Sequence, residues 1–149
     1  MDSLAEFLKE KKRSSSQIKE RQRDLREEWQ KAVSNLFEKI ENWLAPASSE
    51  GLNLKWYETE LDEGDLGKYV APALELEFEG IRVKIEPVGR LVIGARGRVD
   101  ISSPLGVHHL VRLGPEEDDW YLVRDGVDER KRLTKQTLEE LLKEIFALA

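Results

Sequence analysis

The chain has 149 residues, of which 24 are basic and 30 acidic, so its net charge is −6, and it contains no cysteine. This length allows one globular domain, and the lack of cysteine excludes disulfide scaffolds, thiolate metal centres and cysteine nucleophiles. The apolar runs are far shorter than the roughly 20 residues that cross a bilayer, and residues 1–6 do not resemble a secretory signal. We therefore expect a cytoplasmic protein with no membrane partner. The charged fraction of 36% occurs both in heat-adapted proteins and in small acidic proteins of mesophiles, so both origins stay open.

Residues 3–44 predict a helix. Ser3 and Glu6 have the spacing of a capping box, and no glycine or proline occurs before Pro46. Two rows along this helix are apolar at both ends and polar in the middle: Leu4, Lys11, Ile18, Leu25, Ala32 and Lys39, and Leu8, Ser15, Gln22, Trp29, Leu36 and Trp43. Two interpretations are open. Either one long helix projects its first half as a dimerising or docking arm, or a break at the serines separates a short helix from a packed one over residues 17–44.

The two halves of this segment differ in apolar content. The second half has enough apolar residues to pack on a core: Leu25, Trp29, Val33, Leu36, Phe37, Ile40, Trp43 and Leu44. The first half has too few, so we divide the chain into a helical arm or loose N-terminal extension, residues 1–16, and a single α+β domain, residues 17–149. The apolar residues that a monomer would leave exposed are the predicted partner-binding residues: Leu4, Phe7, Leu8 and Ile18.

A β region follows a linker at residues 45–51. Alternation of apolar and polar residues predicts a strand at 52–57 and a hairpin at 74–85. With a two-residue turn at Glu79–Gly80, one face pairs apolar residues and the other pairs opposite charges. The apolar pairs are Phe78–Ile81, Leu76–Val83 and Leu74–Ile85, and the charged pairs are Glu77–Arg82 and Glu75–Lys84. One register satisfies both faces, so the hairpin specifies its own pairing.

The later strands differ from this hairpin. Residues 91–93, 110–111 and 120–123 are apolar at consecutive positions, so both faces of these strands require cover. The N-terminal helix could cover one face, and the C-terminal helix or a second subunit could cover the other.

The chain closes with a further hairpin and a helix. Strands near 96–102 and 107–113 are joined by a predicted turn at 103–106. Residues 134–137 then begin a helix with an apolar packing face: Leu138, Leu141, Leu142, Ile145 and Phe146. The predicted fold is α+β, with a long N-terminal helix, an antiparallel meander of about six or seven strands and a C-terminal helix.

The two histidines, His108 and His109, are adjacent and would point to opposite faces of a strand, so they are poorly placed to share one metal ion. Pairing around the 103–106 turn would set Asp100 opposite His109, as in an acid–base dyad. A register one residue away would set Ile101 there instead. We favour a structural histidine, and the sequence has no nucleophile, glycine-loop or metal-ligand motif. We therefore expect no catalytic, cofactor or metal site.

Positive charge is concentrated in one part of the chain. Residues 80–114 hold six basic and two acidic residues. Arginine suits bidentate contact with phosphate or carboxylate, so a sheet face with Arg90, Arg96, Arg98 and Arg112 could bind an anionic partner. The stretch has no aromatic residue to stack on nucleic-acid bases. Salt bridges within the protein are the alternative that we prefer, and an acidic protein would suit the same arginines.

The function that we predict is a non-enzymatic protein–protein interaction module, such as an adaptor, a chaperone-like protein or an immunity-type protein. Its partner would be another protein or a second copy in a homodimer. The second hypothesis is a nucleic-acid-binding accessory protein that uses the arginine-rich sheet face. A small hydrolase built on His109 and Asp100 is the third.

Overall fold

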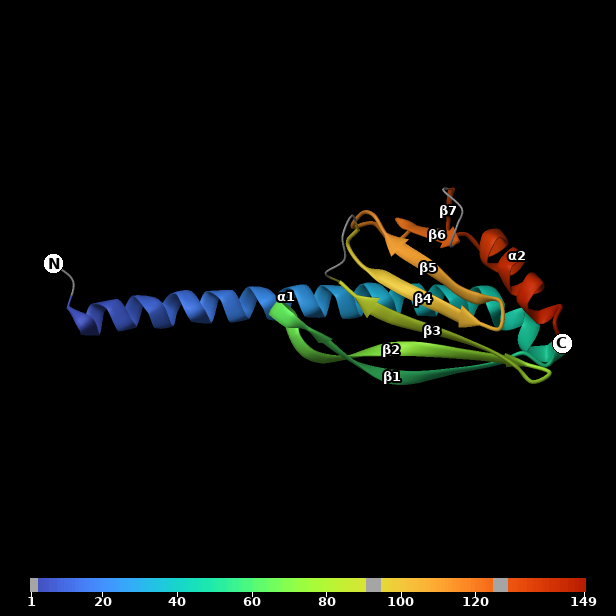
Figure 1. Ribbon diagram of the computed structural model, residues 1–149, viewed down its shortest axis with the longest axis horizontal. Helices are drawn as coiled ribbons and strands as arrows, with labels where there is room; N and C mark the ends of the chain where they lie inside the picture. The colour runs from blue at the N-terminus through green and yellow to red at the C-terminus, as the bar shows by residue number, and fades with distance from the viewer. Residues whose placement is uncertain (1–2, 91–94, 125–128) are drawn as a thin grey trace.

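The computed structural model describes residues 3–90, 95–124 and 129–149. Helix α1 runs unbroken from Leu4 to Leu44 (Figure 1), which resolves the two interpretations in favour of one long helix. The predicted capping box begins it: Ser3 Oγ accepts a hydrogen bond from the Glu6 amide at 3.2 Å, and the Glu6 carboxylate accepts one from the Ser3 amide at 3.4 Å. The predicted linker forms a 3₁₀ helix, η1, over Ala45–Glu50.

The sheet is an antiparallel meander whose spatial order β1 to β7 follows the chain. Its strands are β1 Asn53–Glu63, β2 Gly67–Phe78, β3 Ile81–Gly89, β4 Arg98–Ser103, β5 Gly106–Arg112, β6 Trp120–Arg124 and β7 Arg130–Arg132. A 3₁₀ turn, η2 Gly64–Leu66, joins β1 to β2, and helix α2, Lys135–Phe146, ends the fold. The α+β prediction is confirmed. Within the described residues, no helix is both long enough and apolar enough to span a membrane.

The β2–β3 hairpin has the predicted register on both faces. Phe78 pairs with Ile81, and Glu77 lies opposite Arg82. Glu79 and Gly80 have φ values of 48° and 84°, as in the two-residue turn whose twist matches the strands.

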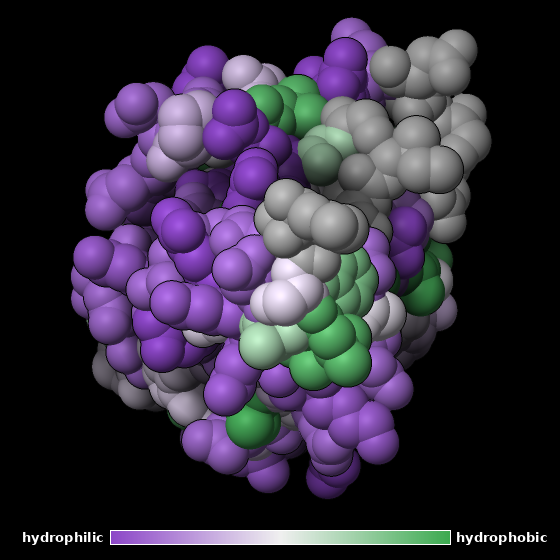
Figure 2. All heavy atoms as spheres, turned by 90° about the vertical axis from the view of Figure 1, so that its left-hand side faces the viewer, coloured by the Kyte–Doolittle hydropathy of each residue, from purple (hydrophilic) through white to green (hydrophobic). Residues whose placement is uncertain are grey.

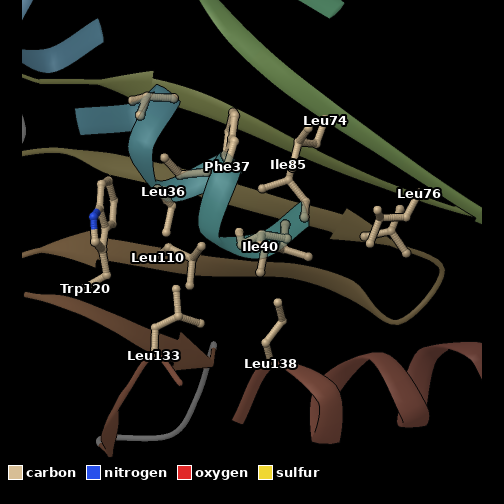
Figure 3. Packing of buried hydrophobic residues seen from close by; sticks show 14 of the residues in the cluster. Leu36, Phe37, Ile40, Leu74, Leu76, Ile85, Leu110, Trp120, Leu133 and Leu138 are labelled. Atoms are coloured by element: carbon tan, nitrogen blue, oxygen red, sulfur yellow. The ribbon is translucent and has the colours of Figure 1, made fainter. Parts of the chain in front are cut away.

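Both helices cover the same face of the sheet. Side chains of α1, α2 and the strands form one buried cluster, in which Ile40 and Leu138 lie near Leu110 (Figure 3). The idea that the helices cover opposite faces is therefore wrong. Residues of β5 and β6 on the other face, Val111 and Tyr121 among them, are half-buried without a helix over them. Residues 91–93, the first of the predicted doubly apolar strands, lie outside the described part of the chain.

Candidate functional site: a projecting arm and an arginine cluster

The N-terminal half of α1 projects away from the sheet (Figure 1). From Leu4 to Arg21 every side chain except that of Ser14 is exposed. These 18 residues, which we call the arm, extend about 27 Å at the rise of an α-helix. The arm thus continues past the boundary predicted at residue 16, while the division into arm and domain stays a prediction.

The predicted partner-binding residues form an exposed apolar seam on the arm. Leu4, Phe7, Leu8 and Ile18 are 71%, 58%, 54% and 59% exposed. Figure 2, which faces the arm end-on, shows hydrophobic atoms gathered near its tip. The spacings of three, four and ten or eleven residues bring these side chains to one side of the helix. Exposed large apolar side chains on one side of a helix are typical of an interaction site.

The charges on the arm are unevenly distributed. Residues 4–21 hold six basic and three acidic residues, a net charge of +3 in a chain whose total is −6. The row on one side of the seam is basic beyond its first residue: Ala5, Lys12, Lys19 and Arg26. The row on the other side continues from the seam residue Phe7 and is mixed: Ser14, Arg21 and Glu28. The seam therefore suits a partner whose apolar surface is bordered by carboxylates.

The arm is fixed to the sheet at its root, residues 25–30. Trp29 is fully buried, and its ring lies 6.0 Å from that of Trp120 between centroids. Arg26 Nη1 donates to the Leu66 carbonyl at 2.7 Å, and Gln30 Nε2 donates to the Val70 carbonyl at 2.6 Å. These contacts hold the direction in which the arm leaves the body.

An ion pair between a buried arginine and a half-exposed glutamate strengthens the root. Arg112, only 5% exposed, donates from Nη1 and Nη2 to the two carboxylate oxygens of Glu28 at 3.1 and 2.7 Å. The hydrogen bond from Arg112 lowers the pKa of Glu28, burial of the carboxyl opposes this shift, and the charges of Arg112, Arg90 and Arg96 add to it. Glu28 was not singled out from the sequence, because no local pattern links residues 84 positions apart.

The four arginines of the predicted patch do not share one face. Arg90 and Arg96 lie within electrostatic range of the Glu28 carboxylate, beside Arg112, and the Arg96 amide donates to the Arg112 carbonyl at 2.6 Å. Arg98 is opposite Val111, so it points to the other face of the sheet from Arg112. There its Nε lies 3.1 Å from Asp100. We call Arg90, Arg96 and Arg112 the arginine cluster.

Asp100 and His109 do face one another across β4 and β5, in the register set by the predicted turn. His109 Nδ1 lies 2.7 Å from Asp100 Oδ1, and the same oxygen also pairs with Arg98. His108 is opposite Ile101, on the helix-covered face. Four cavities of the described chain have linings that include neither Asp100 nor His109. In the described ranges, no cluster of three or more acidic or histidine side chains is arranged to hold a metal ion.

A groove of about 470 Å³ opens between the end of α1 and α2. Apolar side chains dominate its lining, with charged ones at Lys135, Glu139 and Lys143; the others are Trp43, Leu44, Pro46, Ala47, Leu52, Leu142 and Phe146. The sequence predicted both helices but not that the end of α1 lies close to α2, so it did not predict this groove.

Comparisons of the chain with protein-family models, with curated proteins and with solved structures found no match. The fold and the candidate site therefore define the class on their own: an α+β protein with a sequential antiparallel sheet and a projecting helical arm.

Proposed function

We propose that this protein is a cytoplasmic, non-enzymatic interaction module whose arm docks into an apolar groove with an acidic rim on another protein. The observation that carries the proposal is the exposed seam of Leu4, Phe7, Leu8 and Ile18 on a helix that leaves the body. A helix that presents apolar anchors at such spacing is one of the recurring modes of protein recognition. Adaptor, chaperone-like and immunity-type roles all fit it.

The charge beside the seam favours a different protein over a second copy. In a parallel pair of arms, the basic row of one arm would face the mixed row of the other, with Phe7, Ser14 and Arg21. No pair of opposite charges would form in this arrangement. In an antiparallel pair, the basic rows would face each other. Lys11 would also lie within the seam itself. Carboxylates around the apolar groove of a different protein would instead pair with the basic row and with Lys11, so neither like charges nor an unpaired lysine would oppose binding.

Photocrosslinking in the native host at native expression tests this proposal. A photoreactive residue replaces Phe7 in the seam, and a matched control replaces Arg13 on the opposite side of the helix. We expect a protein partner to be captured from position 7 only, with the crosslink mapped to an apolar segment bordered by acidic residues. Its binding to the purified chain should be lost in a Leu4→Ser and Leu8→Ser variant. Capture of a second copy of this chain would instead establish the homodimer and contradict the proposal.

A second candidate function, nucleic-acid binding, is favoured by the net charge of +3 over the arm, residues 4–21. It predicts that a labelled oligonucleotide binds with an affinity that falls steeply as salt rises, because phosphate contacts release counterions. Lys12→Gln with Lys19→Gln should then weaken binding, whereas Leu4→Ser with Leu8→Ser should not. If the serine variant alone loses binding, the apolar seam makes the contact, which supports the protein-docking proposal.

A further inference from the structure

The groove between the end of α1 and α2 has the size and lining of a small-molecule site. Its most buried lining residues are Leu44, Leu52 and Leu142, and the half-buried rings of Trp43 and Phe146 add to its apolar surface. Its volume of about 470 Å³ lies within the range of roughly 300–1,000 Å³ that is usual for ligand pockets. A ligand with an apolar body of moderate size would gain free energy from leaving water for this groove.

The charged lining residues that the structure describes all belong to α2. Lys135, Glu139 and Lys143 follow one another at four-residue spacing, so they form a row along one side of that helix. Lys135 Nζ lies 3.9 Å from Glu139 Oε1, so these two charges compensate each other. In the described ranges, Lys143 has no salt-bridge partner within 4.0 Å. One positive charge thus lies uncompensated at the edge of an apolar groove.

We propose that this groove binds a free fatty acid of medium chain length, with the alkyl chain against the leucines and aromatic rings and the carboxylate at Lys143. Burial of the alkyl chain supplies most of the affinity. Lys143 is exposed, so it pairs with the carboxylate without taking either charge out of water, which would be costly. The groove lies at the end of α1 opposite to the arm (Figure 1), so the site does not depend on the arm-docking proposal.

The size and charge of the groove favour this ligand over a docked helix. One turn of an α-helix with its side chains, at a diameter of about 10–12 Å and a pitch of 5.4 Å, fills about 500 Å³, so the groove has room for a single turn. Helices that dock in grooves use anchors spread over two turns or more. The arm of a second copy is further disfavoured, because its basic row would meet the positive charge of Lys143.

Isothermal titration calorimetry of the full chain with hexanoate, octanoate and decanoate, below the concentrations at which they form micelles, tests this site. We expect each added methylene to tighten binding about three- to fourfold, because it buries further apolar surface. Lys143→Gln should weaken the binding of octanoate about two- to fivefold, the usual contribution of an exposed ion pair. It should leave the binding of octanol, which has no charge, unchanged. Lys68→Gln, at an exposed position on β2, is the matched control and should bind octanoate as the wild type does.

A second variant tests the place of the alkyl chain. Ala47 is half-buried in the wall of the groove, so Ala47→Phe should weaken the binding of decanoate about tenfold or more by filling the space that the chain needs. Circular dichroism checks that this variant folds. If it does not fold, the amide chemical shifts of the wild type with decanoate replace it, and changes confined to the groove residues are then expected.

Three results would overturn the proposal. Affinity that does not rise with chain length, or shift changes at the arm seam instead of the groove, would show that the alkyl chain does not bind here. Equal weakening of octanoate and octanol in Lys143→Gln would show that Lys143 acts through the packing of α2 and not through its charge. Tighter binding of an acidic amphipathic peptide than of decanoate, lost in Ala47→Phe, would assign the groove to a protein partner.

Discussion

The backbone at Gly97 passes directly over the ring of Trp29. A Cβ atom at position 97 would lie 2.2 Å from Trp29 Cζ3, and both residues are buried. We expect Gly97→Ala to lower the free energy of unfolding by about 1–3 kcal/mol through overpacking, measured by urea denaturation. Adding Trp29→Phe should remove part of this penalty, because the smaller ring leaves space. Additive losses in the double variant would show that the two residues are not coupled.

The Glu28–Arg112 pair should make stability depend on pH. Because the pKa of Glu28 is lowered in the folded chain, its contribution is present above the unfolded value near 4.5 and is lost as pH falls through the folded value. At pH 7 we expect Glu28→Gln to cost about 1–3 kcal/mol, less than a fully buried pair because half of the Glu28 side chain is exposed. The difference from the wild type should shrink below pH 4.5. A difference that stays constant down to pH 3 would contradict this assignment.

At the scale of one element, the β2–β3 hairpin depends on its turn. Gly80 has a φ of 84°, which a β-branched residue rarely adopts. We expect Gly80→Val to lower the free energy of unfolding by about 1–3 kcal/mol, measured by denaturant titration. Gly80→Asn is the control and should cost less, because asparagine tolerates positive φ. Equal losses in the two variants would indicate a cause other than the backbone.

The elements that the sequence predicted well are those with two independent local constraints. The β2–β3 register satisfies an apolar face and a charged face at once. The β4–β5 register was left open between two pairings, and the structure has the one that sets Asp100 opposite His109. This register also puts Arg98 and Arg112 on opposite faces. The alternative pairing, Ile101 with His109, would have set Arg98 directly opposite Arg112, so the sequence alone could not separate the two arginines that the predicted patch grouped. The continuity of α1 through Ser14–Ser16 was not decided locally, because serine lowers helix stability only by tenths of a kcal/mol per residue.

At the scale of the whole molecule, periodicity tells which residues require cover but not which element supplies it. The sequence therefore left the arrangement of α1 and α2 open, and the structure puts both on one face. The contacts at the arm root, such as Glu28 with Arg112, join segments 84 residues apart. Only the assembled sheet brings these segments together. The sequence therefore predicted the apolar residues and the arginines of the candidate site but not the contacts at the arm root.

The arm and the body should be independent in stability. In the described part of the chain, the arm is exposed along its length, so the combined variant Leu4→Ser, Phe7→Ser and Leu8→Ser should change the free energy of unfolding by no more than about 0.5 kcal/mol. Leu36→Ala, in the core, is the comparison and should cost about 2–5 kcal/mol. Both are measured by chemical denaturation. A loss of 2 kcal/mol or more in the serine variant would mean that the seam packs on the body.

The same charges that favour an acidic partner predict the behaviour of the isolated chain in solution. Paired arms would set the basic row beside like or neutral residues, so self-association should be weakest at low salt, where repulsion is least screened. We expect light scattering after size-exclusion chromatography to give a monomer of 17.2 kDa at low ionic strength. We expect association through the apolar seam to increase at high salt, where the repulsion is screened, and the triple serine variant should abolish it. A dimer at low salt that persists in that variant would locate the contact elsewhere, and the open face of the sheet would then be the surface to change.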